Sequence, residues 1–113
     1  MALINLTPHP IVVRTDGGDV TIPASGQVAR VTSRQELAGH IELDGVKIPV
    51  QKTTFGQVEG LPEPQDGTIY IVSGLVMTAL AGTRDDVVQP DTSPAGAIRD
   101  ADGRIVAVRG FQK

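Results

Sequence analysis

Groups that could hold an anion meet where a predicted strand runs into a predicted helix. Ser73 and Gly74 follow the apolar residues 68–72 and precede a short segment of helical character. The first turn of a helix has unpaired N–H groups and the positive end of the helix dipole, and a glycine lets a ligand approach the backbone. The pair predicts either a phosphate-binding pocket or a serine that caps its own helix.

Arginines near the end of the sequence could add guanidinium groups to such a pocket. Arg99, Arg104 and Arg109 cluster in a chain with a formal net charge of −3. The planar guanidinium group matches phosphate oxygens with two parallel hydrogen bonds. The cluster favours an anion-binding patch, and its alternative is a set of solvated strand arginines.

A polar turn between two prolines could recognise sugar or phosphate oxygens. Asp91, Thr92 and Ser93 supply a carboxylate and two hydroxyl groups. Loops of this kind often carry specificity, although the same side chains also bond their own backbone in turns. We expect Asp91 or Thr92 to contact ribose hydroxyls, and Tyr70 or Phe55 to contact a base.

A further group of residues could support acid–base or metal chemistry. Arg84 precedes the adjacent carboxylates Asp85 and Asp86, and His9 is held between two prolines. Together with Asp91 they define a possible metal-assisted hydrolase. The alternatives are an exposed ion pair for the first group and a ligand contact or an exposed histidine for His9.

Composition and missing motifs exclude several classes. The chain has no cysteine and two histidines, and it lacks the glycine-rich nucleotide motifs, the paired-histidine zinc motif and the nucleophile-elbow motif. We therefore expect no catalytic residue, no metal and no cofactor. A net acidic chain with few aromatic residues argues against a nucleic-acid partner. No signal peptide or membrane span is visible, so we expect a cytoplasmic protein with no membrane partner.

The elements that must position these residues are short strands and tight turns. Val and Ile far outnumber Leu, and 13 Gly and 8 Pro punctuate the chain. The sequence predicts one domain, residues 1–113, of mainly β (α+β) class. It would be a small antiparallel β-rich domain of hairpins with one short helix at about residues 73–82.

The expected elements follow the chain in order. Residues 4–6, 11–14, 20–22 and 27–31 predict a β-meander. Ser33 and Glu36 have capping-box spacing and Gly39 could end a helix, so residues 33–39 predict one or two helical turns or a polar loop. Asp44 and Gly45 predict a hairpin of residues 40–43 and 46–50, with a strand extension over residues 52–58.

In the second half we expect an exposed loop at residues 59–67, followed by the buried strand at residues 68–72. After the helix comes a turn region, residues 89–96, and then a hairpin of residues 97–99 and 104–109. Alternation along its second strand sets Ile105, Ala107 and Arg109 on one face. The opposite face would hold Arg104, Val106 and Val108.

Several blocks spread over nearly the whole chain resemble a family of short, uncharacterised proteins of bacteria and their phages. They are INLTPHPI at residues 4–11, GTIYIVS at 67–73, RDD at 84–86, PDT at 90–92 and VRGF at 108–111. The resemblance implies no catalytic residue. It implies a phage-encoded protein in the host cytoplasm, with a part in the contest with host defence.

The leading hypothesis is a homo-oligomeric protein that binds a phosphate-bearing nucleotide signal without transforming it. Its ligand contacts would come from Ser73, Gly74, Arg84, Asp91, Thr92, Ser93, Arg99, Arg109, His9 and Tyr70. A second hypothesis is a structural or protein-interaction module, such as a small virion component or an inhibitor of a host enzyme, with free strand edges as its contact surface. The hydrolase is the third.

Overall fold

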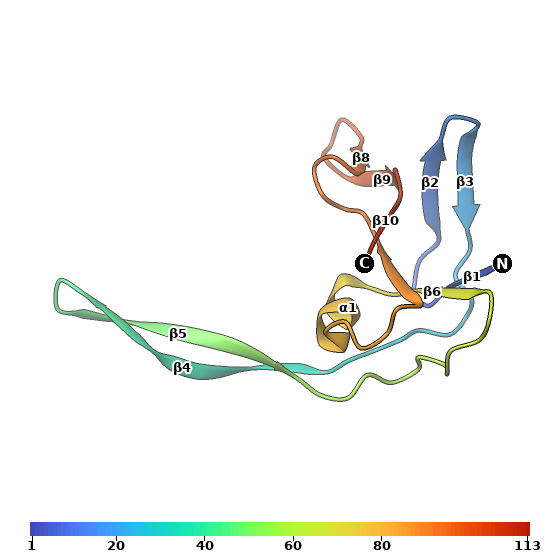
Figure 1. Cartoon of the computed structure of the whole chain (residues 1–113). Coiled ribbons are helices and arrows are strands. Elements are labelled where there is room, and N and C mark those ends of the chain that lie inside the picture. Colours follow the sequence, from blue (N-terminus) through green and yellow to red (C-terminus); the bar gives the residue numbers. More distant parts are fainter.

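The chain folds into ten strands and one short helix, arranged as two small sheets and a projecting hairpin (Figure 1). The computed structural model describes residues 1–113. Strands dominate and the single helix is short, which confirms the predicted mainly β fold class. That helix is too short to cross a membrane.

The first sheet has parallel strands at its centre. Its order is β1 (Ala2–Asn5), β6 (Thr68–Ile71), β7 (Val87–Pro90) and β10 (Phe111–Gln112). The pairs β1–β6 and β6–β7 are parallel, and only β10 runs antiparallel to β7. Parallel neighbours need a crossover connection, and the helix α1 (Gly74–Leu80) lies in the connection from β6 to β7. Local hairpin signals could not predict this pairing.

The second sheet contains two of the predicted hairpins. Its order is β3 (Gly18–Ile22), β2 (Ile11–Thr15), β9 (Ile105–Val108) and β8 (Ala97–Arg99). The pairs β2–β3 and β8–β9 are antiparallel, as predicted, and β2 joins β9 through the single pair Val13–Val108.

The predicted β-meander is wrong at both of its ends. β1 pairs with β6 rather than with β2, because the buried side chain of Asn5 redirects the chain. Its Nδ2 donates to the carbonyls of His9 (2.9 Å) and Ile22 (3.3 Å), and its Oδ1 accepts from the Thr7 amide (2.9 Å). Residues 27–31 form no strand: Arg30 makes an isolated bridge to Glu59, and the amide of Ala29 donates to the carbonyl of Leu6 at 3.0 Å.

The core is divided between the two sheets. Its larger cluster packs α1 against β6 and β7, and its smaller one joins β2, β6 and β9. The larger cluster consists of Leu6, Ala29, Tyr70, Val72, Val76 and Val87. The smaller cluster consists of Ile11, Ile71 and Val108. Since β6 contributes to both, the apolar segment predicted as a buried strand connects the two halves of the body.

Burial along β9 does not follow the alternation of faces predicted for the C-terminal hairpin. Ile105 and Val106 are both exposed, whereas Ala107 and Val108 are both buried. The register of β8 against β9 shifts between Ile98 and Arg99. β2 pairs with β9 only at Val108, the last residue of β9. Burial along β9 therefore follows how far the neighbouring elements extend, and its first half is left uncovered.

The third sheet is a long hairpin of β4 (Ser33–Leu43) and β5 (Val46–Phe55), which we call the arm. Asp44 and Gly45 connect the strands with φ values of 51° and 81°, as expected for the predicted two-residue turn. Both predictions for residues 33–39 are wrong, because this segment pairs with residues 50–55. The arm projects away from both four-stranded sheets and from α1 (Figure 1).

Candidate functional site

The predicted anion pocket at the start of α1 is occupied by the chain's own groups. Ser73 is the N-cap, and its Oγ accepts a hydrogen bond from the amide of Val76 (3.3 Å). The Oε1 of Gln89 lies 2.9 Å from the position that a Cβ on Gly74 would occupy. The junction therefore has the capping role that was the alternative to phosphate binding.

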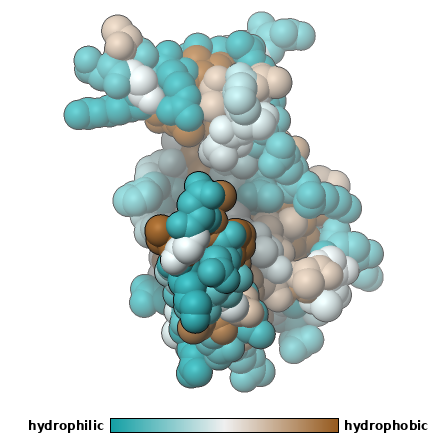
Figure 2. Space-filling view, turned by 90° about the vertical axis from the view of Figure 1, so that its left-hand side faces the viewer, coloured by the Kyte–Doolittle hydropathy of each residue, from teal (hydrophilic) through white to brown (hydrophobic).

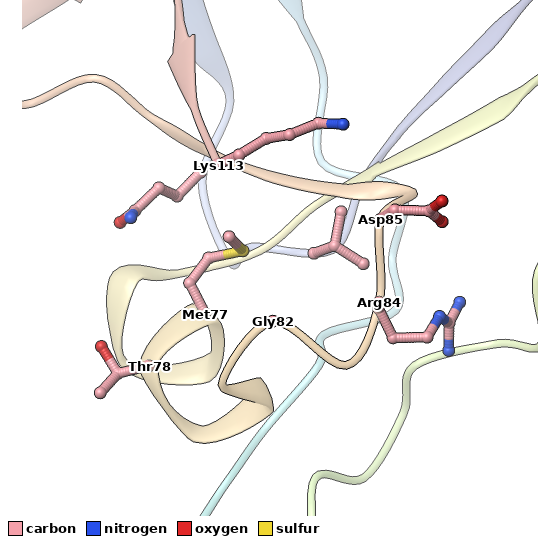
Figure 3. Close-up of a pocket in the computed structure, with 8 residues that line it drawn as sticks. Met77, Thr78, Gly82, Arg84, Asp85 and Lys113 are labelled. Atoms are coloured by element: carbon pink, nitrogen blue, oxygen red, sulfur yellow. The ribbon is translucent and has the colours of Figure 1, made fainter.

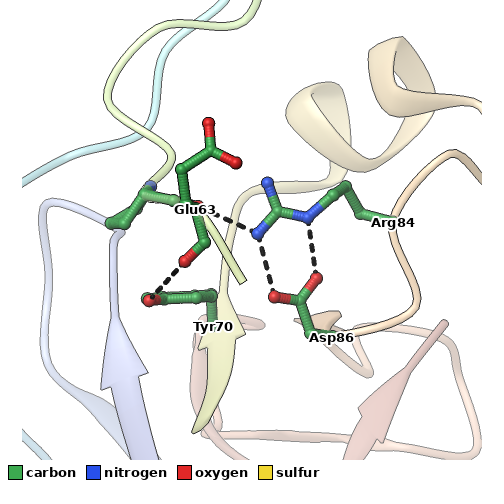
Figure 4. Close-up of polar contacts among 5 residues, drawn as sticks. Glu63, Tyr70, Arg84 and Asp86 are labelled. Atoms are coloured by element: carbon green, nitrogen blue, oxygen red, sulfur yellow. Dashed lines mark hydrogen bonds and ion pairs between the residues drawn. The ribbon is translucent and has the colours of Figure 1, made fainter. Parts of the chain in front are cut away.

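Arg84 forms a two-pronged ion pair with Asp86 (Figure 4). Its Nε and Nη2 donate to the two carboxylate oxygens at 2.9 and 2.8 Å, and Nη2 also donates to the carbonyl of Pro62 at 2.9 Å. The hydrogen bond from Arg84 lowers the pKa of the Asp86 carboxyl below its usual value, against the opposing effect of burial. This clamp fastens the loop after the arm to β7 and leaves little of Arg84 free for a ligand.

Tyr70 is fully buried and its ring is part of the larger core cluster. Its hydroxyl donates to the carbonyl of Glu63 at 3.4 Å, so the same loop is held at a second point (Figure 4). A buried ring has no face on which a base could stack. Phe55, the other aromatic residue predicted to contact a base, lies at the root of the arm.

The polar groups of the turn at residues 91–93 mostly form hydrogen bonds with one another. The Oδ1 of Asp91 accepts from the hydroxyl (2.6 Å) and the amide (3.1 Å) of Ser93. A Cβ on the buried Gly96 would clash with the Asp91 carboxyl group, so the carboxylate is packed against the backbone. Thr92 is exposed and lines a groove described below.

The arginines of the C-terminal hairpin do not converge. Arg99 donates to the carbonyl of Gly103 at 2.7 Å, within its own turn. Arg104 and Arg109 are exposed and belong to none of the three ion pairs in the chain. They stand at either end of β9 and remain available to an acidic partner.

Two hollows of the surface each contain some of the predicted residues. A pocket of about 460 Å³ beside α1 is lined by Arg84, Asp85 and Met77 among others (Figure 3). An apolar groove of about 350 Å³ has His9 and Thr92 in its lining. No hollow combines Ser73, Asp91 and the C-terminal arginines, so the geometry does not favour a single nucleotide pocket. Nucleotide binding stays a prediction.

The residues predicted for a hydrolase are also distributed over separate places. Asp86 is paired with Arg84, Asp91 is bonded to Ser93, and His9 lies in the apolar groove. No group of three histidine or acidic side chains lies close enough to hold a metal ion.

The feature that sequence reasoning missed is the apolar face of the arm. Ile41, Leu43, Val46, Ile48 and Val50 are 59, 59, 60, 42 and 37% exposed. Cross-strand pairing places them on one face, since residues directly opposite in a hairpin point to the same side. Seen from the arm's side of the molecule, apolar patches stand beside hydrophilic atoms on the part nearest the viewer (Figure 2).

The opposite face of the arm is mainly polar, with Glu42, Lys47, His40 and Gln51 along it, and it also has Pro49 and, near the root, the 55% exposed Leu37. No element outside the arm packs extensively against β4 or β5. The alternation of apolar residues around the Asp44–Gly45 turn was a signal for this two-sided hairpin. No local pattern could show that the rest of the chain leaves it uncovered.

No protein-family model, curated protein or solved structure matches this chain. The resemblance to phage and bacterial proteins therefore stays a prediction. What the protein does is inferred below from its own residues.

Proposed function

We propose that this protein is a structural subunit that associates with a neighbouring protein through the apolar face of the arm, and that it is not an enzyme. The observation that carries the proposal is the row of five exposed aliphatic side chains on one side of the hairpin. A lone two-stranded hairpin is marginally stable in water, and it needs a third strand or a packed face to persist. Another polypeptide would supply that cover.

The size of this face sets what it can contribute. Full burial of a Val, Leu or Ile side chain contributes about 1.5–3 kcal/mol of favourable free energy. The five aliphatic side chains of the arm are about half exposed, so covering them with a partner would contribute about 5 kcal/mol to the free energy of binding. Association costs about 4–15 kcal/mol in lost freedom. The apolar face is therefore a substantial anchor, and a stable assembly needs further contacts around it or several arms per assembly.

The edges of the arm are poorly suited to strand addition. The two-residue turn closes on the hydrogen-bonded pair Leu43–Val46, and pairs alternate from there, so the nitrogen of Pro49 faces outward. The Pro49 ring removes a donor from the outer edge of β5, and a register shift between Leu37 and Gly39 disrupts β4. A partner is therefore expected to cover the apolar face rather than extend the sheet.

Native mass spectrometry of the full chain, with variants of each face, tests this function. Ile48→Asp places a charge in the middle of the apolar face and should abolish assembly. Gln51→Asp adds the same charge to the same strand on the opposite face and should assemble as the parent does. Equal behaviour of both variants would contradict the proposal.

A further inference from the structure

The surface contains an apolar groove that the chain itself leaves open. It runs between the start of β2 and the exposed half of β9, and six of its ten lining residues are hydrophobic. Ile105 and Val106, which form one wall, are 41 and 46% exposed. Exposed aliphatic side chains that line a concave surface suit an apolar protrusion of similar chemistry.

The arm of the same chain does not reach this groove. The arm leaves the body near α1 and runs outward, whereas β9 lies with β8 and β2 on another side of the molecule (Figure 1). A hairpin that could enter the groove must therefore belong to a different molecule.

Charge complementarity points to a second copy of this chain as that molecule. The turn at the tip of the arm has the carboxylate of Asp44, while Glu42 and Lys47 face each other on the polar side and offset one another in charge. The ends of β9 have Arg104 and Arg109, which no carboxylate of their own chain pairs with. An arm whose apolar face lies against Ile105 and Val106 would bring Asp44 at its tip to one of these arginines.

We infer that the arm of one subunit docks in the β2–β9 groove of a second copy. This inference rests on the proposed function, since it names the partner that covers the arm. The apolar face of the arm fills the groove, and Asp44 at its tip approaches Arg104 or Arg109, which stand at opposite ends of β9. Each subunit then has one donor arm and one acceptor groove.

Such a contact joins two different surfaces, the arm of one subunit and the groove of the next. The same contact repeated from subunit to subunit therefore builds a larger assembly. Head-to-tail contacts close into rings when the rotation allows it and otherwise grow into filaments. Two subunits could also exchange arms reciprocally and form a dimer. In each closed assembly every arm is paired with one groove.

A mixing experiment with two complementary variants tests the inference. Ile48→Asp damages the arm and keeps the groove, whereas Val106→Asp damages the groove and keeps the arm. Each variant alone should be monomeric in native mass spectrometry. A mixture in which one variant is isotope-labelled should form a heterodimer, because one intact arm can then meet one intact groove. Val20→Asp, an exposed valine of the same sheet outside the groove, is the matched control and should assemble as the parent does.

The remaining outcomes separate the inference from the proposed function. If Val106→Asp assembles like the parent while Ile48→Asp does not, the arm docks elsewhere and the groove assignment is wrong. A parent chain that stays monomeric at its highest soluble concentration overturns the second-copy inference. If neither Ile48→Asp nor Val106→Asp alters an assembly that does form, the proposed function fails as well. Circular dichroism of each variant confirms that the strands are retained.

Discussion

The body and the arm use similar aliphatic residues in opposite ways. Ile71, the last residue of β6, and Val72 after it are completely buried, one in each core cluster, whereas Ile41 and Val46 in the arm are more than half exposed. The strands of the body are five residues or shorter, yet those of the arm have ten and eleven. The longest strands of this protein are thus ones that contain no buried residue.

The difference shows which parts of the chain are complete by themselves. The body has a buried core, no buried side-chain nitrogen or oxygen lacks a partner, and its main uncovered apolar surface is the groove along β9. The arm has a full ladder of backbone pairs but no core of its own. We expect substitutions in the buried core of the body to change folding stability, and those in the arm and in the groove to change association.

The largest contrast should come from truncating one residue in each region. Tyr70→Ala removes a fully buried aromatic side chain and should lower the free energy of unfolding by about 3–5 kcal/mol. Ile48→Ala in the arm should change it by at most about 0.5 kcal/mol in dilute monomer, as for other exposed sites. Chemical denaturation of both variants checks the pair, and a comparable loss from Ile48→Ala would remove the distinction.

A smaller effect should follow from loss of the turn that sends the chain from one sheet to the other. Asn5→Ala leaves the carbonyls of His9 and Ile22 without their donor and the amide of Thr7 without its acceptor. The expected loss of unfolding free energy is about 1–3 kcal/mol. Denaturant titration measures it. Thr15→Ala, which affects only an exposed hydroxyl contact, is a control that should remain near the parent value.

The smallest of the three effects depends on pH. The pKa of Asp86 is lowered in the folded state by Arg84, so the pair contributes stability above the unfolded carboxyl pKa of about 3.9. That contribution is lost as the pH falls through the lower, folded pKa. Arg84→Met should flatten this acid-side decline in thermal stability. A variant with the same steep decline as the parent would show that other carboxyl groups cause it.

The sequence predicted the body better than it predicted the arm. The buried strand, the Ser73 cap and the short helix were recognised because their signals are local: a run of apolar residues, a capping side chain and a glycine stop. The parallel pairing of β1 with β6 joins residues more than sixty positions apart, and no local pattern encodes it.

The first half of β4 shows how a local signal can mislead. Ser33 and Glu36 have the spacing of a capping box, but the segment is held by pairing with β5. Gly39 was predicted to end a helix and instead follows the irregularity in β4, with a φ of 149° that favours glycine. Local signals also do not show whether the polar groups of a turn are free for a ligand: Asp91 bonds Ser93, and Arg99 bonds the carbonyl of Gly103.

The central claim is that another polypeptide covers the apolar face of the arm. Amide hydrogen exchange across β4 and β5 at increasing protein concentration tests it most directly. We predict that exchange in the arm slows as the concentration rises, while exchange in the core strand β6 stays unchanged, and that Ile48→Asp abolishes the slowing. Arm amides that exchange equally fast at every concentration would contradict the account.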